Sequence, residues 1–172
     1  MYQALVALCK EKPLEEISIT GLVETAMVGR STFYRNFDQL SDIPYWKCDA
    51  QFAQVLGGYL KQGQEGGEPL ELLRYVFGYW QNHFEVLKIL LDMNRIDIIY
   101  DCFAKNSYLI MDALMKKKNL TAGQYEYFIA TRIGIFVGVM QTWLRRGRQE
   151  SSEQIAAMLG GQMLPAADEL IL

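Results

Sequence analysis

The sequence predicts an all-α protein in which a small three-helix head, containing a helix-turn-helix, precedes a larger helical-bundle body. Apolar residues recur mostly at a spacing of three or four, and the alternation typical of strands is rare. The chain contains only four prolines, and its glycines cluster at a few points, so long helices are permitted. The composition changes near residues 41–44. We therefore expect a head over residues 1–46 and a body over residues 47–172.

The head begins with a helix over residues 1–10, which Pro13 ends. Ser18 then offers a side-chain oxygen to cap the next helix. A break at residues 27–29 separates that helix from one that restarts at Arg30 and buries Phe33 and Phe37, one turn apart. Two short helices joined by a few residues form the helix-turn-helix layout. The apolar stripe of the first of these two helices comprises Ile19, Leu22, Val23 and Ala26.

The body reads as a series of longer helices. Thr121 with Gln124, and Ser151 with Gln154, each match the capping box that opens a helix. Pro44 is tolerated in a first helical turn. The segment "KQGQEGGEP" is a flexible loop, and "LPAADELIL" is a tail or a short cap. We expect helices over residues 41–60 or 42–60, 70–84, 85–91, 95–118, 121–146 and 151–160.

Composition and spacing exclude several classes of protein. The net charge of −3 is not that of a non-specific nucleic-acid binder, although a local basic face is compatible with it. The three cysteines are scattered without a CxxC spacing, which predicts reduced thiols, no metal and a cytoplasmic location. No continuous apolar run is long enough for a membrane span, and we expect no membrane association. No nucleophile, base and orienting group occur in a catalytic arrangement, so we expect no enzyme and no catalytic residue.

The second short helix has the side chains that a DNA-reading helix needs. At 100° per residue, Phe33 and Phe37 point inward, while polar residues lie broadly opposite. Arg30 stands in the first turn, where base contacts usually occur, and arginine can bond two acceptors of guanine. Hydroxyls, tyrosine and asparagine can donate to phosphates. From the pattern alone, a plain helical head is an equally good interpretation.

Residues 17–37, "ISITGLVETAMVGRSTFYRNF", resemble the DNA-binding signature of the TetR family of bacterial regulators, and "TFY-x-x-F" after a helix and turn is fairly specific. By this resemblance Arg30 and Ser31 fall on base-reading positions, and Thr20 falls on a position that can read bases too. Arg35 faces outward and can serve either role. The positions that contact or support phosphates are Ser18, Thr32, Tyr34 and Asn36.

The head also departs from the family pattern. Met27 replaces the usual turn glycine, Gly29 replaces a hydroxyl cap, and Leu40 stands where a phosphate-gripping lysine is usual. The chain begins without a basic arm, and residues 1–47 contain five basic and six acidic residues. A head of this charge gives up much of the affinity that counterion release supplies. These features indicate weak DNA binding, a start upstream of this chain, or a lost DNA role.

The body is rich in aromatic residues, and an aromatic-lined space among helices with a few polar groups is the usual site for a small ligand. By the resemblance, the body senses an effector, here unknown, and forms a two-fold dimer. An equally simple interpretation is that these rings are core. The candidate ligand-binding residues are Trp46, Phe52, Tyr75, Tyr79, Trp80, Tyr100 and Phe103.

The helix over residues 121–146 is the candidate for dimerisation. Its broad apolar stripe comprises Ile129, Ile133, Phe136, Val137, Met140 and Leu144. Gly134 and Gly138 are four residues apart and would let another helix come close. A monomer could instead use the same stripe as core.

Two functions follow. The first is a dimeric, ligand-responsive transcriptional regulator, most often a repressor in this family, that binds double-stranded operator DNA. The alternative is a relative of this family that has lost operator binding and acts as a coactivator or protein-interaction dimer.

Overall fold

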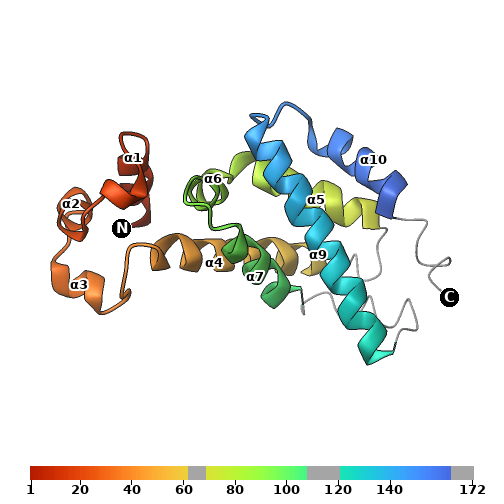
Figure 1. The fold of residues 1–172 in the computed structure, drawn as a ribbon, viewed down its shortest axis with the longest axis horizontal. Coiled ribbons are helices and arrows are strands. Elements are labelled where there is room, and N and C mark those ends of the chain that lie inside the picture. The colour runs from red at the N-terminus through yellow and green to blue at the C-terminus, as the bar shows by residue number, and fades with distance from the viewer. Residues whose placement is uncertain (62–68, 108–120, 164–172) are drawn as a thin grey trace.

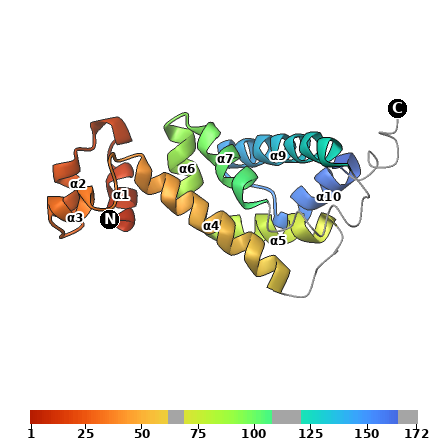
Figure 2. The ribbon, with the colours of Figure 1, turned by 90° about the horizontal axis from the view of Figure 1, so that it is seen from below.

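The computed structural model describes residues 1–61, 69–107 and 121–163, and every regular element within these ranges is helical. The all-α fold class predicted from the sequence is confirmed. The first three helices lie together at one end of the molecule (Figure 1). A long helix, α4 (Asp42–Lys61), leads from them into the remaining helices, and Figure 2 shows the same arrangement from below.

The head is built from four short elements: α1 (Tyr2–Cys9), the 3₁₀ turn η1 (Leu14–Glu16), α2 (Ile19–Thr25) and α3 (Arg30–Tyr34). The predicted cap of α2 is confirmed, because Ser18 Oγ accepts a hydrogen bond from the Gly21 N–H at 3.0 Å. Leu5, Leu22 and Phe33 are completely buried and form the centre of the head, whereas Phe37 is only partly buried at its edge. The inward anchor of α3 is therefore Phe33.

The turn between α2 and α3 closes through Met27. The Met27 N–H donates to Glu24 O at 3.0 Å, and the Val28 N–H donates to Val23 O at 2.9 Å. This pair of bonds is the Schellman arrangement that ends a helix with one residue in the left-handed conformation. Met27 has a φ of 53° and a side chain that is 91% exposed. A residue with a Cβ thus stands where glycine has the lowest energy.

The body helices are α4, α5 (Pro69–Asn82), α6 (Glu85–Asp92), α7 (Ile96–Asn106), α9 (Ala122–Arg145) and α10 (Ser152–Met163). Both predicted capping boxes are present, at Thr121 with Gln124 and at Ser151 with Gln154. The helix predicted over residues 95–118 is described as far as residue 107, and its remainder lies outside the described residues, as do the predicted loop at 62–68 and the tail.

The body core joins helices that are distant in the sequence. Trp80 of α5 and Trp143 of α9 are fully buried in one cluster with residues of α4, α6, α7 and α10. Polar contacts align α4 with α7, because Asp49 accepts hydrogen bonds from both Asn106 and Lys105 at 2.7 Å. A Cβ added to Gly160 of α10 would come within 2.4 Å of Leu70 Cδ2 of α5, so the Leu70 side chain packs directly on the glycine and would have to shift for a larger residue.

The apolar stripe of α9 that was predicted for dimerisation lies largely inside the chain's own core. Ile133, Phe136, Val137 and Met140 are at most 6% exposed and pack inside the chain's own core, while Ile129 and Leu144 flank it and are partly buried. The stripe predicted for a partner is therefore occupied by the other helices of the same chain, which is the alternative that the periodicity left open.

Helix α9 is also the one helix, among the described residues, that is long and apolar enough to cross a membrane. Length and composition are the whole of that signal, and a core helix of a soluble protein satisfies it as well. One face of α9 is buried in the core of the chain.

Candidate nucleic-acid interface and effector cluster

Arg30 is the residue that the head geometry favours most for contact with an outside partner. It is the first residue of α3, and its side chain is exposed. Its guanidinium reaches back across the turn and donates a hydrogen bond to the Thr20 hydroxyl in the first turn of α2. Within the part of the chain that the structure describes, no carboxylate forms an ion pair with Arg30. Its positive charge is therefore not paired with a carboxylate among the described residues.

The other residues predicted to contact DNA differ in how exposed their side chains are. Ser31, Tyr34 and Arg35 are exposed on or next to α3, and Thr32 is half-buried. The Tyr34 ring packs edge-on against Phe33 with the centroids 5.2 Å apart, so one face of the tyrosine is fixed by the core.

Two of the side chains predicted to contact DNA already form hydrogen bonds with the chain's own backbone. Ser18 Oγ caps α2, as described above. The Asn36 amide donates to Thr32 O at 2.7 Å, beyond the last residue of α3. Both side chains hold helix ends, and their polar atoms are partly consumed by that role.

The start of α4 is built without the usual lysine. Leu40 packs against the head core with partial burial. The Asp42 carboxylate accepts hydrogen bonds from the backbone N–H groups of Asp38 and Gln39, both at 2.9 Å. This corner is therefore fixed by an apolar contact and a carboxylate, and no cation stands at the place where the family pattern has one.

Three of the residues predicted to bind the effector, Phe52, Trp80 and Phe103, lie together in the body. The rings of Phe52 and Trp80 are 4.9 Å apart, and those of Phe52 and Phe103 are 5.3 Å apart. Tyr75, Tyr79 and Tyr100 are partly buried against the same cluster. Trp46 is different, because it is 56% exposed on α4 and lies outside the cluster.

Buried polar groups accompany these rings, and the sequence reading missed them. Gln51 is only 4% exposed, and its amide nitrogen lies 3.3 Å from the Tyr79 hydroxyl, which in turn donates to Gln54 Oε1. Gln51 Oε1, the Tyr59 hydroxyl and Trp80 Nε1 are buried and have no hydrogen-bond partner among the described residues. Such unpaired groups are costly, and they are expected where a water molecule or a ligand binds. Burial raises the pKa of Tyr79 and of Tyr59, so both phenols remain protonated and can donate.

A family model named TetR_C_8, described as a transcriptional regulator C-terminal region, matches residues 67–163. This match covers more than half of the chain and includes most of the body helices. The chain belongs to the TetR family of transcriptional regulators. A comparison with curated proteins found no match. The family assignment agrees with the resemblance of residues 17–37, which lie outside the matched region and support it independently.

In this TetR-family chain, none of the described residues covers one face of α9. Among those residues, a Cβ added to Gly134 or Gly138 would meet no atom within 4 Å, and Tyr127 on the same face is 79% exposed. The exposed threonines of this face bond back to their own helix, Thr131 to Tyr127 O and Thr142 to Gly138 O, both at 2.9 Å. Around Gly134 and Gly138 this face therefore carries no bulky side chain at the glycines, and the hydroxyls of Thr131 and Thr142 are already bonded.

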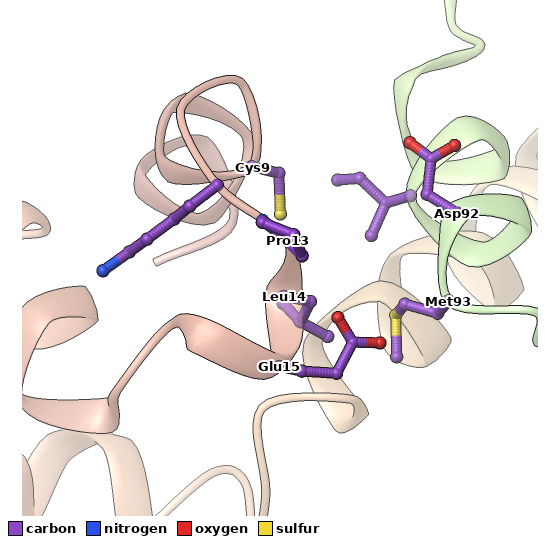
Figure 3. Close-up of a pocket in the computed structure, with 8 residues that line it drawn as sticks. Cys9, Pro13, Leu14, Glu15, Asp92 and Met93 are labelled. Atoms are coloured by element: carbon purple, nitrogen blue, oxygen red, sulfur yellow. The ribbon is translucent and has the colours of Figure 1, made fainter.

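A small cleft lies where the head meets the body. Its volume is about 50 Å³, well below the several hundred Å³ of a usual ligand site. Figure 3 shows Cys9, Pro13, Leu14 and Glu15 of the head facing Asp92 and Met93 at the end of α6. Burial, and then the Asp92 carboxylate, raise the pKa of the Cys9 thiol. The cleft has room for water only, and it marks the joint between the two parts.

His83 is the chain's single histidine. His83 is exposed, stacks on Tyr79 with the rings 4.2 Å apart, and its Nδ1 lies 2.8 Å from Tyr79 O. In the described ranges, no three His, Cys, Asp or Glu side chains are grouped so as to hold a metal ion.

Proposed function

We propose that this TetR-family regulator is a dimeric, ligand-responsive repressor in the cytoplasm. Residues 1–46 would bind operator DNA through α2 and α3, and residues 47–172 would bind the effector and a second copy. The observation that carries the proposal is an exposed arginine at the first position of the second helix of a helix-turn-helix, with no carboxylate partner among the described residues. The function needs no catalytic residue.

The charge and placement of Arg30 suit DNA. A helix-turn-helix presents the N-terminal residues of its second helix to base edges in the major groove. Ser31 and Arg35 are exposed beside Arg30 and can reach bases or phosphates. The head as a whole is slightly acidic, so few phosphates are neutralised and we expect a shallow salt dependence.

A second copy would cover the open face of α9. Two α9 helices can approach closely where Gly134 and Gly138 face each other, because nothing projects from the helix there. This surface replaces the buried stripe as the proposed dimer interface.

The effector would bind beside Phe52, Trp80 and Phe103. The unpaired polar atoms Gln51 Oε1 and Trp80 Nε1 supply one acceptor and one donor in an otherwise apolar cluster. An effector of a flat apolar body with both a donor and an acceptor group would satisfy them.

DNA binding is the step to test first. We would measure the fluorescence anisotropy of a labelled duplex, taken from upstream of the chain's own gene, at about 50 and 200 mM salt. Arg30→Ala is expected to weaken selective binding by about 1–3 kcal/mol. Lys10→Ala is the matched control, because Lys10 is an exposed head cation at the end of α1, away from α3 in sequence. Equal effects of the two substitutions, or no selective binding by the natural chain, would contradict the proposal.

A second function is favoured by the acidic head and by the aliphatic side chain of Leu40 at the usual lysine position. In it, the chain has lost operator binding and acts as a coactivator or protein-interaction dimer. An intact dimer that selects no DNA at either salt concentration would support this function over the first.

A further inference from the structure

The hydrogen bond between Arg30 and Thr20 joins two residues that the sequence reading treated as separate DNA contacts. From this bond we infer that Thr20 is a positioning residue, which acts on DNA through Arg30 by holding its guanidinium in one orientation. The inference rests on the proposed DNA-binding function, and it assigns part of the preference for one base pair to the hydrogen bond between Arg30 and Thr20.

The placement of the two residues makes the bond directional. Thr20 lies in the first turn of α2, and Ser18, not Thr20, caps that helix. The Thr20 hydroxyl is thus free to accept a hydrogen bond from outside its own helix. Arg30 lies at the first position of α3, ten residues later, and donates from one terminal nitrogen to Thr20 Oγ1. The bond bridges the two helices at the side where both begin.

A tethered arginine reads a base better than a free one. The guanidinium has five N–H donors in a rigid plane, and the bond to Thr20 uses one of them. The remaining donors can still form the paired contact with guanine O6 and N7. Arginine loses considerable rotamer freedom on binding, and a side chain that is already ordered loses less. Since Thr20 Oγ1 accepts this bond without a charge, it orients Arg30 and does not neutralise it.

The rest of the head does not provide this orientation. Gly29 caps α3 without a side chain, and in the described chain the side-chain hydrogen bond of Arg30 goes to Thr20 and not to Ser31 or Arg35. The neighbouring Met27 side chain is directed to solvent and is almost fully exposed. In the described residues, Thr20 is the side chain that holds the guanidinium.

The test is a double-mutant cycle on DNA binding. The full chain would first select from a pool of duplexes with a randomised central segment, and one enriched duplex would then serve as the probe, with an unselected duplex as reference. Thr20→Val removes the hydroxyl and keeps the shape of the side chain, and Arg30→Ala removes the guanidinium. We expect Thr20→Val to weaken binding of the selected duplex roughly three- to tenfold, and to have almost no further effect in the Arg30→Ala chain.

Three further readouts separate the outcomes. Thr20→Ser keeps the hydroxyl and should bind as the natural chain does. Repeating the selection with Thr20→Val should relax the preference at the base pair that Arg30→Ala also relaxes, while the other positions are kept. Circular dichroism and thermal unfolding check that each variant is folded.

Additive effects of Thr20→Val and Arg30→Ala would overturn the inference, because Thr20 would then contact the DNA directly, while the proposed function would stand. Loss of preference at a different base pair would overturn it in the same way. If the natural chain enriches no sequence, the proposed function and the inference fall together.

Discussion

Replacing Met27 by glycine should stabilise the head, because it removes a Cβ from a left-handed position. Met27 occupies the residue after the end of α2, with a φ of 53°, in a Schellman turn closed by the bonds to Glu24 O and Val23 O. An L-residue in this conformation places its Cβ too close to the following carbonyl oxygen, whereas glycine has no such contact.

The magnitude follows from three terms. The left-handed conformation costs a residue with a Cβ about 1–2 kcal/mol. The methionine side chain is 91% exposed, so its removal gives up almost no buried area. Glycine has more freedom in the unfolded chain, which returns about 0.5–1 kcal/mol of the gain. The net stabilisation expected for Met27→Gly is therefore about 0.5–1 kcal/mol, or about 1–4 °C in Tm for a chain of this size.

The measurement is urea unfolding followed by far-ultraviolet circular dichroism, with the free energies of unfolding compared at equal m values. Met27→Ala is the matched control, because it removes the same exposed side chain and keeps the Cβ. The control should unfold close to the natural chain. If Met27→Gly is no more stable than Met27→Ala, the strain argument is wrong.

Three further results are expected. Gly138→Leu on the open face of α9 should convert the proposed dimer to a monomer in sedimentation, without lowering the stability of the monomer. The control is Gly57→Leu on α4, where an added Cβ is equally free of described neighbours, and it should leave the dimer intact. Equal behaviour of the two variants would refute the proposed interface. Phe33→Ala should destabilise the head by about 3–5 kcal/mol and abolish selective DNA binding, since Phe33 is fully buried in the head core. If urea unfolding showed only a small decrease in the free energy of unfolding, this packing would be contradicted. The pKa of the Cys9 thiol is raised, so the neutral thiol is favoured in the folded chain. The alkylation rate of Cys9 should therefore rise at a higher pH than the alkylation rate of a free cysteine does. The free energy of unfolding should fall as the pH rises through the range in which thiols ionise. Asp92→Asn should bring the alkylation profile back toward lower pH; an unchanged profile would show that the carboxylate has no part in the shift.

Local signals were read correctly from the sequence. Ser18, Thr121 and Ser151 cap the helices that they were predicted to cap, because capping involves residues within one turn of each other. Contacts between residues that are far apart in the sequence were predicted less well. The stripe on α9 was correctly seen as apolar, but periodicity shows only that a face is buried and does not show what covers it. The pairing of Arg30 with Thr20, and that of Gln51 with Tyr79, depends on how two helices cross, and no spacing rule predicts it.

By itself, the sequence determined the helical fold class, the helix starts and the DNA-binding signature of residues 17–37, since each depends on neighbours in the chain or on a pattern that neighbours spell out. The tertiary structure alone decided which face of α9 is buried in the core, that Trp46 stands apart from the buried rings, and that Thr20 accepts a hydrogen bond from Arg30. The reason is physical: side chains acquire their partners only when helices pack, and the packing of α4, α5, α7 and α9 brings together residues from all parts of the body.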